Sequence, residues 1–166
     1  KYLAISSSNP NGEIQIFELD DFGKPIRLLP RVSQLEPGII TDLAWHPSGN
    51  YLAFIRNSTK EMGLIKLVKD GSTIIRLEQY GDVAKFEGNP VSGIFSKNGD
   101  TFFVLDKGDQ TNGMVFELKL SFETEGKHSF MSKVEVGKNP TAIIMHPDGE
   151  TLFISNSLRS DLTGQS

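Results

Sequence analysis

The chain has 166 residues and a formal net charge of −4, with 23% charged and 37% hydrophobic residues, close to the averages of globular domains. It contains no cysteine, which excludes disulfides and thiolate metal sites and leaves the compartment open, with a slight preference for the cytoplasm. Lys and Arg are scattered singly, and no apolar run approaches the roughly 18 residues of a membrane span, so neither direct nucleic-acid binding nor a membrane segment is expected.

The first predicted elements are β-strands within residues 1–36. Residues 1–5 and 12–19 carry short apolar runs that match later segments of the chain, at 50–54 and 63–69. They are interpreted as the second and third strands of a repeated unit, here named B and C. A fourth strand, D, completes this first unit, which lacks its strand A.

Two complete units follow, and part of a fourth ends the sequence. Strands A to D of the second unit, residues 37–86, are predicted at 40–45, 51–56, 63–69 and 73–79. Those of the third unit, residues 87–137, are predicted at 91–95, 101–105, 113–121 and 128–136. Residues 138–166 provide strands A and B. No apolar residues recur at helical spacing for long enough to indicate a helix.

A repeat of 50 residues supports these assignments. The turn between strands A and B recurs as His-Pro-Ser-Gly, Ser-Lys-Asn-Gly and His-Pro-Asp-Gly, with the glycine at 49, 99 and 149. Four short strands in a period of about 40 to 50 residues are typical of a propeller blade. The sequence therefore predicts an all-β fold: a β-propeller of four-stranded antiparallel blades, present as an incomplete fragment of about three blades.

The incomplete units predict uncovered sheet faces. Closed propellers have four to eight blades, so the chain is interpreted either as part of a longer protein or as one subunit of a ring completed by its own copies. Within the chain, Trp45, Phe95 and Met145 stand 50 residues apart at the end of strand A. We expect all three between adjacent blades.

Motifs for catalysis and metal binding are absent or explained by turns. The sequence has no G-x-S-x-G, H-E-x-x-H, P-loop or dinucleotide-binding fingerprint. His46 and His146 are expected to accept hydrogen bonds from the turn backbone, as Ser96 does more weakly, and His128 to contact solvent at the rim. The stretch 106–112, which is rich in oxygen donors, lacks the ligand spacing of an EF-hand loop and is interpreted as a polar hairpin loop.

The glycosylation sequon at 57–59 matters only if the protein is secreted. No metal and no cofactor are predicted.

Propeller geometry indicates where a ligand would bind. Loops joining D to A and B to C emerge on the same face, around a central channel where ligands usually bind. The candidate binding residues are the polar groups at the ends of strand B and in these loops: Arg31, Asp42, Arg56, Asn89, Asp106, Asn139 and Asn156. No catalytic residue is assigned.

Two families share parts of this pattern. His-Pro-Asp-Gly at 146–149 followed by Leu-Phe-Ile-Ser-Asn-Ser at 152–157 resembles the YVTN and lactonase-type seven-bladed propellers, the 6-phosphogluconolactonase-like proteins. Residues 42–49, Asp-Leu-Ala-Trp-His-Pro-Ser-Gly, are similar to the inner strand and turn of a WD-repeat blade. The Gly-His and Trp-Asp pairs of that family are missing. These resemblances rest on turn and core residues and imply an architecture without transferring a catalytic residue.

Two function classes remain. The favoured one is a non-enzymatic platform whose blade loops bind a protein partner, or the remaining blades of the propeller. The alternative is a lactonase-type hydrolase acting on a sugar lactone such as 6-phosphogluconolactone, with a small anionic ligand. That enzyme needs cations and a general base near the channel. Arg31, Arg56 and Lys138 are the candidate cations, and Asp42 or Asp106 the base.

Overall fold

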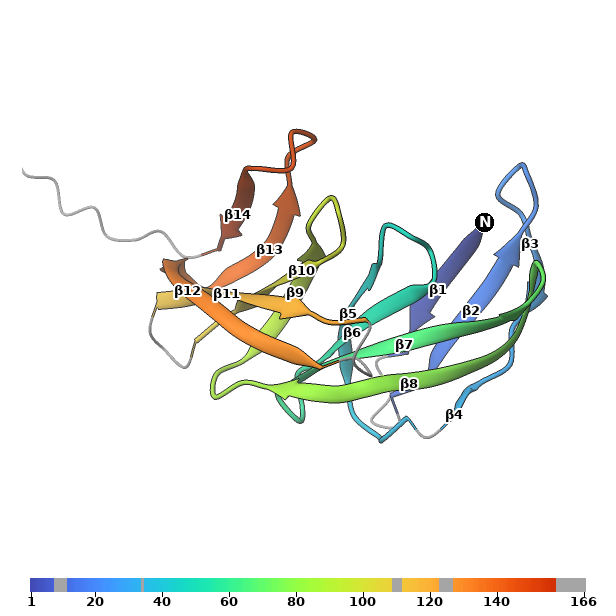
Figure 1. Ribbon diagram of the computed structural model, residues 1–166. Helices are drawn as coiled ribbons and strands as arrows, with labels where there is room; N and C mark the ends of the chain where they lie inside the picture. The colour runs from blue at the N-terminus through green and yellow to red at the C-terminus, as the bar shows by residue number, and fades with distance from the viewer. Residues whose placement is uncertain (8–11, 34, 109–111, 123–126, 158–166) are drawn as a thin grey trace, which may run out of the picture.

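The computed structural model describes residues 1–7, 12–33, 35–108, 112–122 and 127–157. This part of the chain contains fourteen β-strands and no helix, which confirms the all-β prediction. The strands form four sheets that lie side by side in a curved row (Figure 1).

The sheets follow the chain in order, and neighbouring strands are antiparallel except for β4. The first sheet contains β1 (Tyr2–Ser6), β2 (Ile14–Leu19) and β3 (Pro25–Leu28). The second contains β5 (Ile40–Trp45), β6 (Tyr51–Arg56), β7 (Glu61–Asp70) and β8 (Thr73–Lys85), with β4 (Val32–Ser33) at its edge. The third contains β9 (Pro90–Phe95), β10 (Thr101–Asp106), β11 (Asn112–Leu120) and β12 (His128–Lys138), and the fourth β13 (Pro140–Met145) and β14 (Leu152–Asn156). The second and third sheets are thus the four-stranded blades that the sequence predicts.

The turns between strands A and B are equivalent in three sheets. Gly49, Gly99 and Gly149 have φ angles of 68°, 84° and 79°, which an L side chain adopts only with strain. Each glycine N–H donates to the carbonyl three residues earlier, at 2.8, 3.0 and 2.9 Å. The three turns project on one side of the molecule, at the top of Figure 1. The 50-residue register is therefore a structural repeat.

Strand β4 is a feature that the sequence did not indicate. Val32 and Ser33 pair in parallel with Leu77 and Glu78 on the outer strand of the second sheet, and the Ser33 hydroxyl donates to the Leu77 carbonyl at 3.1 Å. The connection between the first two sheets therefore runs along the outer edge of the second and covers part of it.

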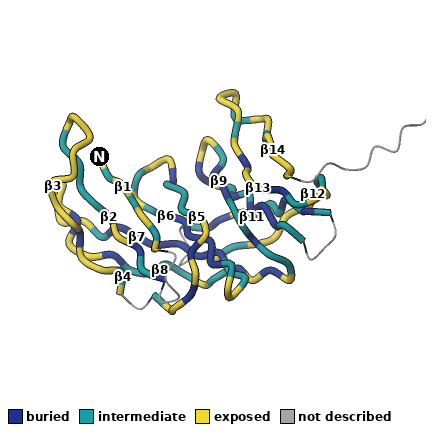
Figure 2. Tube along the Cα trace, turned by 180° about the vertical axis from the view of Figure 1, so that it is seen from behind, coloured by how far each residue is buried: buried dark blue, intermediate teal, exposed yellow. Residues whose placement is uncertain are grey.

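The hydrophobic core lies between neighbouring sheets, and the strands of the second and third sheets carry most of the buried residues (Figure 2). Phe95 is buried, and its ring centroid lies 5.0 Å from that of His46 in the preceding sheet. Trp45 is partly buried 6.2 Å from Tyr2 of the first sheet, and Met145 is also partly buried. Phe95 and Trp45 thus lie between adjacent sheets as expected, whereas the position of Met145 between blades stays a prediction.

Candidate functional site

The last residue of strand B occupies an equivalent place in three sheets. Arg56, Asp106 and Asn156 pair with Ile40, Pro90 and Pro140, and in each sheet the register then shifts by one residue. Such a bulge redirects the strand end. The sequence therefore located a position that the fold repeats.

A glycine of the D–A loop, or in the third sheet a glycine near the end of strand D, lies against each of these strand ends. A Cβ on Gly38 would come within 2.2 Å of the Arg56 side chain, one on Gly88 within 2.2 Å of the Asp106 carboxylate, and one on Gly137 within 2.8 Å of the Asn156 amide. The loops approach so closely because these positions have no side chain.

The B–C loop of the second sheet also contacts the D–A loop of the third. Asn57 donates from its side-chain amide to the Pro90 carbonyl at 3.1 Å, and Lys60 donates to the Glu87 carbonyl at 2.8 Å. The two loop types therefore lie together, as propeller geometry predicts. The asparagine of the sequon is a link between sheets in this structure.

Arg56 is buried, with a side chain only 2% exposed. Its Nη1 donates to Glu61 Oε2 at 2.9 Å, and its guanidinium lies 5.1 Å from the centroid of the Phe54 ring. Its Nε and Nη2 atoms have no hydrogen-bond partner among the described residues. Arg56 thus forms a buried ion pair in which, of its three side-chain nitrogens, only Nη1 has a hydrogen-bond partner among the described residues.

Asp106 is buried as well and organises its own loop. Its Oδ1 accepts hydrogen bonds from the backbone N–H groups of Asn89 and Gly108, both at 2.8 Å. The Oδ2 atom is buried and has no partner among the described residues. The structure therefore brings the predicted site residues Asn89 and Asp106 together, as a joint between the D–A and B–C loops.

Asp42 connects the inner strands of the second and third sheets. Its Oδ1 accepts from the N–H of Leu43 at 2.9 Å. Its Oδ2 accepts from the Ser92 hydroxyl at 2.7 Å and the Gly93 N–H at 2.9 Å. Because Asp42 and Ser92 stand 50 residues apart, their equivalent positions in neighbouring blades could have revealed this contact.

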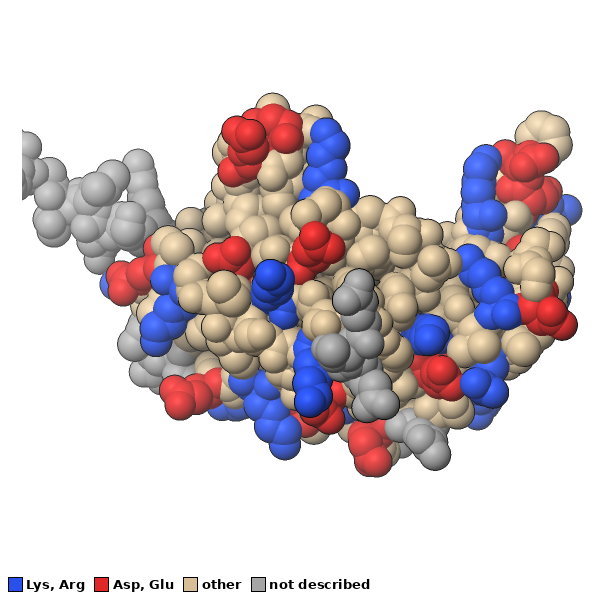
Figure 3. All heavy atoms as spheres, in the orientation of Figure 1, with Lys and Arg blue, Asp and Glu red and all other residues tan. Residues whose placement is uncertain are grey.

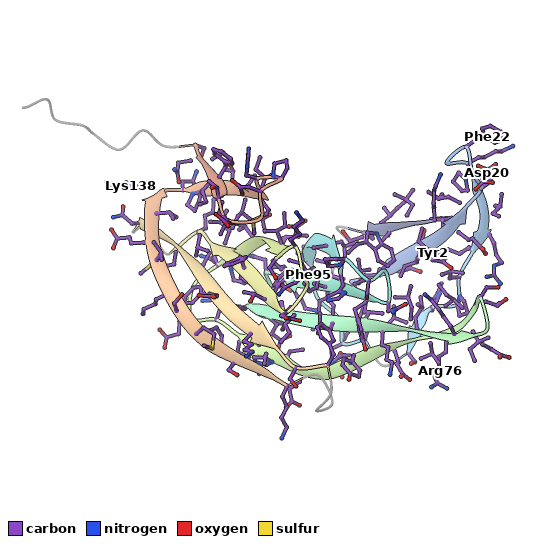
Figure 4. The ribbon with its side chains drawn as sticks, turned by 45° about the horizontal axis from the view of Figure 1, so that its top comes forward. Tyr2, Asp20, Phe22, Arg76, Phe95 and Lys138 are labelled. Carbon is purple, nitrogen blue, oxygen red and sulfur yellow. The ribbon has the colours of Figure 1, made fainter. Side chains whose placement is uncertain are left out.

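The remaining predicted site residues lie at the surface or in the D–A loops. Arg31 is exposed and forms an ion pair with Glu13 at 3.4 Å. Asn139 has a φ of 50°, and its side-chain amide donates to the Ser157 hydroxyl. Asn156 is exposed, and Lys138 lies exposed at the end of β12 (Figure 4).

The two turn histidines have different surroundings. His46 accepts from the Ser48 N–H at 3.0 Å through Nδ1, and its ring is packed edge-on against Phe95 and Phe122. Burial lowers the pKa of His46 below its ordinary value. His146 is exposed and accepts from the Asp148 N–H at 3.3 Å. Both histidines act in their turns as expected.

His128 differs from the expectation of a solvent contact. It is partly buried at the start of β12, with its ring 6.2 Å from that of Phe130. Burial lowers its pKa.

Two hollows between strands were not predicted, because their walls come from strands far apart in the sequence. One, of about 450 Å³, is lined by Asp100, Lys119, Leu120, Ser121, Phe122 and Ser129. The other, of about 240 Å³, is mostly apolar and lies between the third and fourth sheets. It is lined by Glu117, Ser132, Phe103, Val115, Val134, Val136, Leu152 and Ile154.

Charge and metal-ligand patterns give no further site. Acidic and basic side chains are intermixed over the face in Figure 3. Within the described ranges, no three His, Asp or Glu side chains gather to hold a metal ion. Residues 109–111, in the stretch considered above for calcium, lie outside the described part. In the described chain, no helix is long and apolar enough to cross a membrane.

Comparison with solved structures places this chain among propellers. It is similar to a putative 6-phosphogluconolactonase from Bacteroides fragilis (TM-score 0.72, 16% identity, 94% of this chain and 44% of that one). It is also similar to the Pseudomonas aeruginosa periplasmic gluconolactonase PpgL (0.63, 16%, 92% and 46%). A third similar structure is the β-propeller domain of Cps50 (Swd1) from Myceliophteria thermophila (0.56, 19%, 91% and 44%).

No protein-family profile and no curated protein sequence matches the chain. The fold is therefore that of an incomplete β-propeller of the kind found in lactonase-like and WD40 proteins. The chain spans less than half of each of the three solved structures.

Proposed function

We propose that the protein is a β-propeller platform that binds a partner protein through the loops at the D–A side of its sheets. The observation that supports this most directly is that the two carboxylates considered as general bases already accept hydrogen bonds from the backbone. Asp42 and Asp106 each accept hydrogen bonds from two backbone N–H groups. A general base must be free to accept a proton from water. Both oxygens of Asp42 are engaged in this way, and Asp106 Oδ2, which has no partner, is buried away from water.

Two of the three candidate cations form ion pairs, and the third, Lys138, is exposed. Arg56 pairs with Glu61, and Arg31 with Glu13. Polar groups around Asn139 and Asn156 remain exposed on this side. A rigid scaffold with variable exposed loops suits recognition of a macromolecule.

A capture experiment tests the platform. The immobilised chain is compared with a double variant at the D–A side, Lys138→Glu with Ser157→Tyr. The matched control, Lys97→Glu with Pro147→Tyr, changes exposed residues of the A–B turns on the opposite side. We expect one partner protein to be captured by both the wild type and the control chain, and not by the D–A variant. Equal capture by all three chains contradicts the proposal.

A lactonase-type hydrolase is the second candidate, and the unpartnered atoms favour it. Arg56 Nε and Nη2 and Asp106 Oδ2 are buried without partners at equivalent strand ends, and one similar structure is a putative 6-phosphogluconolactonase. The test is hydrolysis of 6-phosphogluconolactone by wild type, Asp106→Asn and the exposed control Asp148→Asn. Hydrolysis that only Asp106→Asn abolishes supports this enzyme; a rate equal to the spontaneous one rules it out for this chain.

A further inference from the structure

Two junctions between sheets differ at their outer rim: the first junction, between the first and second sheets, and the second junction, between the second and third. Residues 29–39 connect the sheets of the first junction. Within this connection, Leu29 is buried, and Val32 and Leu35 are partly buried, against the cluster that joins the two sheets. Strand β4 of the same connection pairs with the outer strand β8. An added extended segment therefore closes the rim of the first junction.

The connection in the second junction is too short to close the rim in the same way. It consists of residues 86–89, between β8 and β9. Fully extended, these residues span about 14 Å, which they need to run from the outer strand of one sheet to the inner strand of the next. Among the described residues, no strand pairs with the outer side of β12 (Figure 1). This edge presents backbone N–H and C=O groups to which a further strand can pair.

The register across the sheets shows which part of β12 corresponds to the edge that β4 covers. Leu52 and Phe102 are equivalent residues of strand B, 50 residues apart. Across their sheets they align with Gln79 on β8 and with Phe130 on β12. The pairing of β4 begins at Leu77, two residues before Gln79. The equivalent edge of β12 therefore begins two residues before Phe130.

An exposed aromatic side chain lies at this edge. Phe130 is 48% exposed, although its ring centroid lies 5.5 Å from that of Phe86 and 6.1 Å from that of Phe116. Because Phe86 is buried, Phe130 is the outermost ring of an aromatic cluster at the rim of the second junction. In the first junction, Val32 of the added segment covers the rim. An apolar side chain opposite Phe130 would do the same in the second.

Lys133 adds a positive charge to the same surface. Lys133 and Phe130 face the same side of β12, because their partners on β11, Phe116 and Leu118, are two residues apart. Lys133 is exposed and takes part in none of the ion pairs formed by the described residues. A carboxylate that follows the apolar residue of an added strand would complement this charge.

We propose that the outer edge of β12 binds an extended segment of a partner protein, which adds to the third sheet as β4 adds to the second. The segment places an apolar side chain on Phe130 and an acidic side chain near Lys133. Backbone hydrogen bonds to the strand edge provide affinity, and the two side chains provide specificity. This surface lies at the rim and not at the D–A side, so the inference does not rest on the loop-binding platform.

Fluorescence anisotropy with a labelled peptide tests this surface. The peptide has the sequence of residues 29–36 with Gln34→Leu, so that a leucine lies opposite Phe130 when the peptide pairs as β4 does, and it ends in Glu36. We expect saturable binding that Phe130→Ser weakens about tenfold, because one buried apolar contact is lost. Ile75→Ser is the control, since Ile75 is comparably exposed near the start of β8. Circular dichroism shows that each variant remains folded.

A charge exchange provides a second test that leaves the aromatic cluster intact. Lys133→Glu should weaken binding of this peptide, and Glu36→Lys in the peptide should restore it. Backbone N-methylation separates strand addition from side-chain contact alone. Successive N–H groups of a strand point to opposite sides, so of two peptides methylated at residues 32 and 34 or at 33 and 35, one should lose binding.

Hydrogen exchange locates the bound peptide. We expect slower exchange of β12 amides when the peptide is present, with no change in β8. Protection of β8 alone would mean that the peptide replaces β4, and it overturns the inference. The same conclusion follows from no binding up to about 1 mM peptide, from binding that is insensitive to Phe130 and Lys133, or from undiminished binding of both methylated peptides.

Discussion

His46 links the stability of the molecule to pH. Its ring lies among Tyr51, Phe95 and Phe122, and burial lowers its pKa despite the opposing charge of Asp100. The unfolded chain, with the ordinary value of 6.5, therefore binds a proton before the folded chain does. The stabilising contribution is complete above pH 6.5 and is lost as pH falls below it, until the folded His46 is itself protonated.

Urea unfolding at pH 8 and pH 5 measures this effect. We expect His46→Gln to reduce the loss of unfolding free energy between the two pH values. His128→Gln reduces it too, because burial also lowers the pKa of His128. Equal losses in the wild type and His46→Gln contradict the assignment.

Asp106 and Asp148 can be compared directly, because each carboxylate accepts hydrogen bonds from two backbone N–H groups of its loop. Asp106 accepts from two backbone N–H groups in a buried place, and Asp148 accepts from those of Glu150 and Thr151 in an exposed turn. Asp106→Ala leaves its donors without partner or water, which costs about 1–3 kcal/mol for each. Asp148→Ala costs less than about 1 kcal/mol because water replaces the carboxylate. Thermal and urea unfolding compare the two, and equal losses contradict the structural role of Asp106.

At the scale of elements, the A–B turns connect neighbouring sheets. A Cβ on Gly99 would lie 2.1 Å from His46 Nε2, whereas one on Gly49 would meet no atom within 4 Å. Both glycines have positive φ, so each alanine variant costs about 1–2 kcal/mol of backbone strain.

Gly99→Ala must also displace His46 from its pocket. We therefore expect it to lower the unfolding free energy by about 3 kcal/mol or more, against about 1–2 kcal/mol for Gly49→Ala. Equilibrium denaturation measures the difference. If the two variants are equally stable, the contact between turns contributes nothing to stability.

The sequence predicts the boundaries of a strand correctly where residues close to it in the sequence determine them. β5 and β6 begin and end where expected, because the His-Pro-Ser-Gly turn between them fixes both strands. β8 continues to Lys85, beyond the predicted 79, because Gly81 adopts a positive φ of 72° beside a register shift between Met62 and Leu64. β4 depends on a two-residue parallel pairing with β8, which leaves no local pattern.

The candidate site was predictable in position but not in environment. The repeat locates Arg56 and Asp106 at equivalent strand ends. Their burial depends on Gly38 and Gly88, which approach from another loop, and on partners such as Glu61. A single sequence does not reveal which loops close over a charged group.

At the scale of the whole molecule, stability is unevenly distributed along the row of sheets. The cluster between the second and third sheets contains residues from both four-stranded blades, including Leu118, which is fully buried. Among the residues that the structure describes, the cluster between the third and fourth sheets has Leu105, Val115 and Ile143 as its buried members. Buried apolar area provides most of the stabilising free energy, so the fourth sheet is held least strongly.

Native-state hydrogen exchange tests this gradient. We expect the amides of β13 and β14 to exchange through local opening well before those of β6 and β10, whose exchange requires global unfolding. Leu118→Ala should lower protection throughout the described strands, because truncating a buried leucine costs about 2–5 kcal/mol of global stability. Ile143→Ala should lower it mainly in β13 and β14, since Ile143 supports only the weakly held sheet. Uniform protection across all four sheets, or a global effect of Ile143→Ala, would mean that the row unfolds as one cooperative unit.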